Sequence, residues 1–135
     1  MTTSLDATVL IDVLNGRSER VRSLFSQGKI DRASWVISAV AYHEVLFGAQ
    51  IRGRRAQERA LLEQLFAGCT IAPFTVAHAE ETTTLRYELR RLGTPNNGLD
   101  VLIAGQARAE GWAVATANLK DFNRMPDLVI EDWSA

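Results

Sequence analysis

The chain has 135 residues, of which 47% are apolar and 23% are charged, as is ordinary for a globular protein. This length suits one α/β domain with a sizeable core, so we expect residues 1–135 to form a single domain. The formal net charge of −1 gives no overall attraction to nucleic acid. Arginine nevertheless supplies 13 of the 15 basic residues, and its planar cation suits phosphate and carboxylate groups.

The cysteine content and the apolar runs bear on the compartment. Cys69 is the single cysteine and cannot form an intrachain disulfide, which favours a reducing compartment. No charged segment followed by an apolar stretch and a cleavage site opens the sequence, and no apolar run approaches the roughly 18 residues of a membrane span. We therefore expect a cytoplasmic protein that neither is exported nor spans a membrane.

Strand and helix patterns alternate along the chain. In chain order the expected elements are a strand passing into a helix at 4–14, a helix at 18–27, a strand at 34–37, a helix at 39–52, a helix at 54–67, a strand at 69–74, a helix at 76–92, a helix at 101–110, a strand at 112–116 and a strand at 128–130. Parallel strands need crossover connections, so this order predicts an α/β fold with a central parallel sheet covered on both faces.

Several residues mark the expected boundaries. Gly28 is placed as a C-terminal stop for the helix at 18–27, and Ser38 can cap the helix that follows the second strand. Gly53 separates the helices at 39–52 and 54–67. Cys69 stands where a buried strand is expected to begin.

Four polar side chains stand at strand ends or near helix starts: Asp6, Glu44, Asp100 and Asn118. Ligands of open parallel sheets bind outside the carboxyl ends of the strands. Asp6 lies in the first strand segment, Asn118 follows the strand at 112–116, and Asp100 stands at a helix N-terminus, where the helix dipole favours an ionised carboxylate. Glu44 lies on the helix that follows the second strand. We expect all four side chains to reach one rim of the sheet.

Such a set of oxygen ligands suits Mg²⁺ or Mn²⁺, which usually keep several waters and bind a few carboxylates in an open cleft. Zinc is not expected, because the chain has no Cys/His cluster. A bound divalent ion would neutralise a phosphodiester and activate water for in-line hydrolysis. Taken singly, however, an Asp at a helix start is more often a cap, and a Glu on an amphipathic helix usually faces solvent.

Four segments resemble, in order, the motifs of the PIN-domain family, and most closely those of the VapC-type toxins of bacterial toxin–antitoxin pairs. They lie at Leu5–Ile11, Ile37–Ala49, Gly93–Ala104 and Thr116–Trp133, and together they extend over essentially the whole chain. The resemblance implies a Rossmann-like three-layer α/β/α PIN domain. It also implies an Mg²⁺- or Mn²⁺-dependent endoribonuclease that cleaves RNA and is neutralised by a cognate VapB-like antitoxin. Proteins of this kind form homodimers, and the antitoxin places an arginine among the carboxylates.

Carried over by position, Asp6, Glu44 and Asp100 match the family's acidic metal ligands. The fourth acidic position falls on Asn118, which can offer a neutral oxygen but removes one negative charge. Asp121, three residues later, either supplies that charge or caps a short turn. We therefore expect Asp6, Glu44, Asp100, Asn118 and Asp121 to form the catalytic site, with Asp6, Glu44 and Asp100 as the ligands of one metal ion in the free protein.

Two other functions remain open. One is a PIN-domain nuclease of RNA maturation without a toxin role. The other is a non-catalytic PIN-like scaffold whose acidic residues bind a partner's arginine, which the amide at Asn118 motivates. Metal-dependent cleavage and toxicity on expression discriminate among the three.

Residues around the expected site carry further hypotheses. The hydroxyls of Thr8 and Thr116 either orient Asp6 or a metal-held water, or make ordinary hydrogen bonds at strand ends. His43 points about 100° away from Glu44 on its helix, which favours a packing or surface role. Asp12 is expected to be a helix or surface residue.

Basic and apolar residues on the helices bear on partners. Arginines at 52, 54, 55 and 59 form a basic elbow between two helices, and Arg86 and Arg90 share a helix face. Both groups could contact RNA phosphates or could simply be solvated. The helices at 39–52 and 54–67 carry more apolar side chains than one stripe needs. These side chains belong either to the core or to a partner-binding surface.

Overall fold

A computed structural model describes all 135 residues. Its elements are β1 (Thr3–Leu5), α1 (Ala7–Asn15), α2 (Glu19–Ile30), β2 (Trp35–Ser38), α3 (Ala39–Ile51), α4 (Arg55–Leu65), β3 (Thr70–Ala72), α5 (Val76–Arg91), α6 (Leu99–Glu110), β4 (Ala113–Thr116), α7 (Leu119–Phe122) and β5 (Ile130–Asp132). The five strands form one sheet in the order β3-β2-β1-β4-β5, and every neighbouring pair is parallel. The expected α/β fold with a parallel sheet is thus confirmed.

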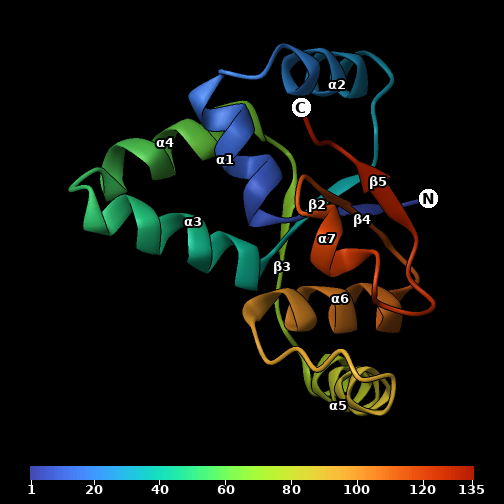
Figure 1. Cartoon of the computed structure of the whole chain (residues 1–135). Coiled ribbons are helices and arrows are strands. Elements are labelled where there is room, and N and C mark those ends of the chain that lie inside the picture. Colours follow the sequence, from blue (N-terminus) through green and yellow to red (C-terminus); the bar gives the residue numbers. More distant parts are fainter.

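The helices form two layers around the sheet (Figure 1). Helices α1, α3 and α4 lie on one side, and α3 contacts both α1 and α4. On the other side α6 contacts β4, and α5 packs against α6 as the outermost helix of that layer. None of the helices combines the length and apolar character needed to cross a membrane.

The strand order places a topological switch point beside β1. From β1 the chain adds β2 and then β3 on one side, and it returns after α5 and α6 to place β4 on the other side. Crossover connections therefore leave β1 and β4 toward opposite faces, and a crevice opens at the carboxyl ends of these two strands. Asp6 directly follows β1, and Asn118 lies just after β4.

The central strands are buried on both faces. Every residue of β1 and β4 is buried, and Leu5, Val114 and Ala115 are completely inaccessible to solvent. Burying a side chain the size of leucine contributes roughly 1.5–3 kcal/mol, so these short strands depend on the helices above and below them. The buried β1–β4 pair therefore fixes the positions of the residues that follow these strands, Asp6 and Asn118.

The boundary signals at Ser38 and Gly53 are confirmed and the one at Gly28 is not, while the short helix α7 was not among the expected elements. Ser38 caps α3 by accepting a hydrogen bond from the Val40 amide at 3.2 Å, as expected. The expected stop at Gly28 is wrong, because α2 continues to Ile30. A Cβ at Gly28 would lie 2.0 Å from Cζ2 of Trp35, so the glycine lets the indole pack against the helix.

Two strands also differ from expectation. The strand after Cys69 is not buried: β3 is an edge strand whose Thr70 and Ile71 are exposed. The last strand begins at Ile130 rather than at Leu128. Apolar content alone does not distinguish an edge strand from a central one, since an edge strand pairs on one side only.

Candidate active site

The site begins where β1 passes into α1. Asp6 is 1% exposed and is the N-cap of α1. Its Oδ1 accepts hydrogen bonds from the Val9 amide at 3.0 Å and from the Thr8 hydroxyl at 2.6 Å, and its Oδ2 accepts one from the Thr116 hydroxyl at 2.5 Å. Asp6 is therefore a helix cap and also a carboxylate fixed at the carboxyl end of the central strand.

Burial raises the pKa of Asp6, and the hydrogen bonds from Thr116, Thr8 and Val9 act in the opposite direction. Desolvation disfavours the charged form of a carboxylate, whereas hydrogen bonds to the charged form favour it. The net pKa is still raised. A nearby cation would therefore stabilise this carboxylate more than water does.

The two threonines connect the end of β4 to Asp6. The Thr116 hydroxyl accepts a hydrogen bond from the Asn118 amide at 2.8 Å, and the Thr8 hydroxyl accepts one from the Ala117 amide at 2.9 Å. Each hydroxyl donates to Asp6 and accepts from the segment after β4. Of the two expected roles for these threonines, the structure thus supports the orientation of Asp6.

Asn118 joins two carboxylates. Its side-chain amide nitrogen donates to Asp100 Oδ2 at 3.0 Å and to Asp121 Oδ2 at 3.1 Å. Asp100 comes from the first turn of α6 and Asp121 from α7. Asn118 therefore uses its two N–H groups to hold Asp121 beside Asp100, which places the Asp121 charge at the site.

Burial and the neighbouring charges of Asp6 and Asp121 raise the pKa of Asp100, and the hydrogen bond from Asn118 lowers it in part. Like charges disfavour the ionised form of a carboxyl group. Asp6 and Asp121 thus each lie close enough to Asp100 to repel its charge. A cation in their midst would relieve this repulsion.

Glu44 reaches the same crevice from α3, which contacts both α1 and α6. Its Oε1 is buried and has no hydrogen-bond partner. Burial first, then the charges of Asp100 and Asp6, raise the pKa of Glu44 to about 7. A buried carboxylate oxygen without a donor is costly unless a cation or a water satisfies it.

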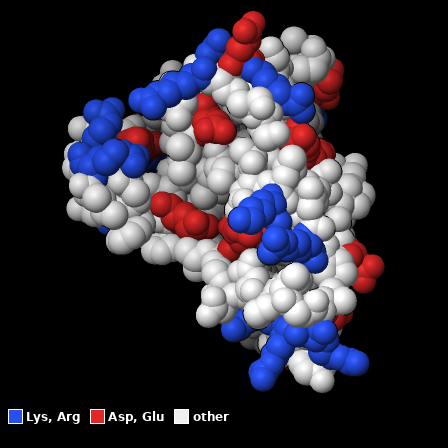
Figure 2. All heavy atoms as spheres, viewed as in Figure 1, with Lys and Arg blue, Asp and Glu red and all other residues white.

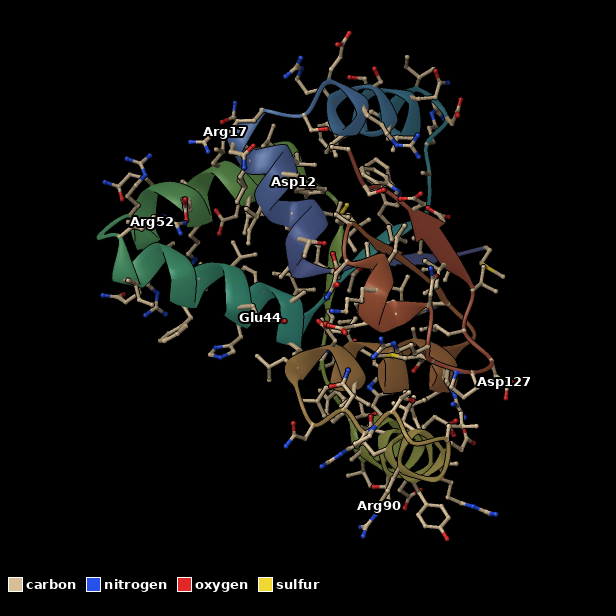
Figure 3. The ribbon with its side chains drawn as sticks, in the orientation of Figure 1. Asp12, Arg17, Glu44, Arg52, Arg90 and Asp127 are labelled. Atoms are coloured by element: carbon tan, nitrogen blue, oxygen red, sulfur yellow. The ribbon has the colours of Figure 1, made fainter.

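Figures 2 and 3 show how these groups lie. Acidic side chains gather in a hollow at the centre of the face in Figure 2, and Figure 3 places Glu44 on α3 facing the region between α1 and α6. No three His, Cys, Asp or Glu side chains are grouped closely enough, as the side chains stand, to hold a metal ion between them. Mg²⁺ usually keeps several waters and takes only one or two carboxylates, so an open set of oxygens with one unpartnered member still fits it.

Asp12 and His43 lie as expected, and His78 has a structural role that the sequence did not indicate. Asp12 is partly buried on α1, and this burial raises its pKa. His43 is exposed and stacks on Phe47, with ring centroids 6.2 Å apart. His78, to which the sequence assigns no role, is buried, accepts from the Thr75 amide through Nδ1 and lies 2.8 Å from a Glu110 carboxylate oxygen. Its role is to cap and anchor α5, and no motif in the sequence signals it.

The α3–α4 hairpin keeps apolar surface exposed. Phe47 is 60% exposed and Ile51 is 71% exposed. In the basic elbow, Arg52 pairs with Glu58 at 2.7 Å. Of the two alternatives for the apolar side chains of this hairpin, exposed surface holds for Phe47, whereas Leu62 and Phe66 belong to the core.

Comparisons with known proteins now identify the fold family. The PIN domain model matches residues 4–128. The chain belongs to the PIN domain family. Over 96% of both chains, this PIN domain is 30% identical to the tRNA(fMet)-specific endonuclease VapC of Salmonella typhimurium. It is 27% identical to Ribonuclease VapC2 of Haemophilus influenzae, again over 96% of both chains.

Solved structures agree with this family. The VapBC complex of Salmonella typhimurium bound to DNA contains a chain that matches this PIN domain with a TM-score of 0.84 and 29% identity, over 98% of both chains. The VapBC2 complex of Rickettsia felis matches with a TM-score of 0.87 at 24% identity, over 99% of this chain and 100% of that one. The resemblance seen in the sequence motifs is thus confirmed.

Proposed function

We propose that this PIN domain is a VapC-type toxin: a metal-dependent endoribonuclease that hydrolyses RNA phosphodiester bonds and is neutralised by a cognate VapB-like antitoxin. The observation that carries the proposal is the unpartnered, buried Oε1 of Glu44 beside the charges of Asp100 and Asp6. The full-length relatives named as ribonucleases and as a tRNA endonuclease support it. The structural neighbour solved as a VapBC complex supports the antitoxin partner.

Asp6, Glu44 and Asp100 would hold Mg²⁺ or Mn²⁺, which supplies positive charge for the phosphodiester and acidity for a water molecule. Asp6 keeps its direction because two hydroxyls and one amide fix both of its oxygens. Asn118 sets the position of Asp100 and keeps Asp121 at the edge of the site. The side chains of Asp6 and Asp100 are therefore held in position before the substrate binds. Such preorganisation is the main source of electrostatic catalysis.

The test is RNA cleavage by charge-removing variants. Asp6→Asn keeps an oxygen for the helix cap, and Asp100→Ala removes a carboxylate from the first turn of α6. We expect both to lower the cleavage rate by roughly 100-fold or more while the circular dichroism spectrum and Tm stay near those of the parent protein. Chelation by EDTA should abolish parent activity, and Mg²⁺ or Mn²⁺ should restore it.

Glu80→Gln is the matched control, because Glu80 is an exposed carboxylate on α5 outside the site. It should leave cleavage unchanged. Undiminished cleavage by both Asp6→Asn and Asp100→Ala would overturn the proposed site.

Substrate and toxicity can be tested together. Initiator tRNA is the first substrate to try, since a relative is named as a tRNA(fMet)-specific endonuclease. A toxin arrests growth when it is expressed, and the product of a neighbouring open reading frame should relieve the arrest. An RNA-maturation nuclease would cause no arrest, and a non-catalytic scaffold would neither cleave RNA nor bind Mn²⁺ in calorimetry.

A further inference from the structure

A hollow lies away from the acidic crevice, between α5 and the loop that leads into α6. It has a volume of about 790 Å³. We call it the α5 groove, and it is lined by Phe74, Ala79, Thr82, Thr83, Arg86, Tyr87, Arg90, Pro95, Asn96, Asn97 and Leu102. No carboxylate is among these residues, although the chain has one more acidic residue than basic residues.

The polar groups of the α5 groove are mostly free donors. Arg86 and Arg90 make no hydrogen bond or ion pair, unlike Arg108 on the neighbouring α6, which binds two glutamates. Asn96 uses its side-chain oxygen to accept from the Gly98 amide at 2.8 Å, which leaves its N–H groups free. Two unpaired guanidinium groups and a free amide in a concave surface favour an anionic ligand.

An aromatic ring stands between these cations in the sequence. Tyr87 is 62% exposed, and the Arg91 guanidinium lies over its ring at 6.0 Å from the centroid. In Figure 2 basic side chains gather at the lower end of the molecule, where Figure 1 places α5, and Figure 3 shows Arg90 there. Arginines beside an exposed aromatic ring are typical of surfaces that bind single-stranded nucleic acid by phosphate contact and base stacking.

The α5 groove is connected to the acidic site through the start of α6. Pro95–Asn97 line the groove and lead directly into this helix. Leu102 lines the groove, while Asp100, two residues earlier, belongs to the site. Side chains two positions apart point to roughly opposite sides of a helix. An RNA chain bound at the acidic site beside Asp100 can therefore pass around the N-terminus of α6 into the α5 groove.

From this geometry we infer that the α5 groove binds a single-stranded part of the RNA substrate that extends beyond the cleavage site. Arg86 and Arg90 contact successive phosphates, and Tyr87 stacks on a base. The inference rests on the proposed ribonuclease function, but its binding test does not require cleavage.

The test measures the affinity of a fluorescent, unstructured RNA of about ten nucleotides by anisotropy, in an Asp100→Asn background that prevents cleavage. Arg86→Ala/Arg90→Ala should weaken binding at least about tenfold. It should also reduce the slope of log affinity against log salt concentration by about 1.4, since each phosphate contact on a single strand contributes about 0.7 to that slope. Arg86→Lys/Arg90→Lys should keep most of the salt dependence.

Tyr87→Ala should weaken binding about tenfold without changing the salt dependence, and Tyr87→Phe should bind like the parent. In the cleaving enzyme, Arg86→Ala/Arg90→Ala should raise KM for a long RNA, with kcat unchanged. It should leave cleavage of a trinucleotide unchanged, because so short a chain stays at the acidic site.

Arg55→Ala/Arg59→Ala is the matched control, because it removes two exposed arginines at the same spacing from α4, in the opposite helix layer. An equal loss of affinity in this control would assign the effect to the overall charge and would overturn the inference.

Unchanged binding by Arg86→Ala/Arg90→Ala would also overturn the inference. So would a change of oligomeric state in light scattering, which would make the groove a face between copies of the chain. A parent protein that binds RNA through the groove but cleaves none would refute the proposed function and leave the binding surface standing.

Discussion

At the scale of single residues, Glu44 has the largest consequence for pH. The pKa of its carboxyl group is raised from 4.5 to about 7. Between these values the folded protein holds more protons than the unfolded chain, so the free energy of unfolding falls as pH rises through this window. Below about pH 4.5 the group is protonated in both states, and above about pH 7 it is ionised in both.

We therefore expect the metal-free protein to be less stable at pH 8 than at pH 5, by on the order of 1 kcal/mol from this residue, because solvent screens the half-buried carboxylate. Urea unfolding in EDTA at several pH values measures how steeply the free energy of unfolding changes with pH. Glu44→Gln should flatten it, and saturating Mn²⁺ should restore stability at pH 8 by binding the folded state. An identical slope in Glu44→Gln would show that Glu44 does not carry the effect.

Asn118 has a different consequence, which concerns metal stoichiometry. Its amide donates to Asp100 and Asp121 and adds no charge. Asn118→Asp would replace two donors with a third carboxylate at the same place, so the three groups would repel one another until a cation neutralised them.

We expect Asn118→Asp to bind more Mn²⁺ per chain in calorimetry than the parent protein, which should bind one ion. The variant should also be less stable than the parent in EDTA, because the repulsion is then uncompensated. A stoichiometry that stays at one ion in both proteins would exclude a second metal position at Asn118.

Much of this candidate site could be predicted from the sequence, because Asp6, Asp100 and Asn118 follow a strand or begin a helix. Asp6 follows β1 and Asp100 stands in the first turn of α6, and such positions converge at a switch point of a parallel sheet. The amide bridge of Asn118 could not be predicted, because it depends on the side-chain directions of residues from α6 and α7. Spacing in sequence does not set those directions.

At the scale of elements, the contact between α5 and α6 depends on one glycine. A Cβ at Gly105 would lie 1.9 Å from the Thr82 hydroxyl and 2.8 Å from the Thr82 Cα. The second contact is with backbone, so a side-chain rotation cannot relieve it. The two helices can approach this closely only because Gly105 has no side chain.

We expect Gly105→Ala to destabilise the fold by about 1–3 kcal/mol, because overpacking outweighs the better helix propensity of alanine. Gly48→Ala in α3 is the control: its Cβ would meet only the Arg52 guanidinium, at an ordinary 3.4 Å. That variant should be as stable as the parent or up to about 1 kcal/mol more stable. Thermal unfolding measures both, and a Gly105→Ala protein as stable as Gly48→Ala would contradict the packing argument.

Gly28 shows why sequence signals failed at this scale. A glycine near the end of a helix pattern usually marks a C-terminal stop. Here the chain continues as helix, because the glycine makes room for Trp35 from β2. Only the partner across the interface distinguishes a glycine that ends a helix from one that makes room for a neighbour.

At the scale of the whole molecule, Arg108 connects distant parts of one layer. Its side chain is 8% exposed, and it binds Glu81 at 2.7 Å and Glu88 at 2.8 Å on α5. It also donates to the Pro126 carbonyl, ahead of β5, at 3.3 Å. Glu88 and Glu81 raise the pKa of Arg108, and Arg108 lowers that of Glu88. One cation on α6 thus holds the outermost helix and the segment that leads into the last strand.

We expect Arg108→Lys to lower the free energy of unfolding by about 1–3 kcal/mol, because a point charge cannot replace a fork that serves three acceptors. Arg52→Lys, which alters an exposed pair with Glu58, should change it by less than about 1 kcal/mol. Urea unfolding compares the two variants. Equal and small effects would show that the Arg108 contacts contribute little to the stability of the fold.

The N-cap role of Asp6 links activity to turnover of the protein. Most substitutions at this position remove the cap of α1 together with the carboxylate, and loss of an N-cap costs about 0.5–2 kcal/mol. In a protein of ordinary stability, such a loss increases the unfolded fraction that proteases degrade. Inactive variants that arise at this position should therefore accumulate poorly. Asparagine is the exception, since it caps a helix as well as aspartate does, and it would leave a folded copy that lacks the Asp6 carboxylate.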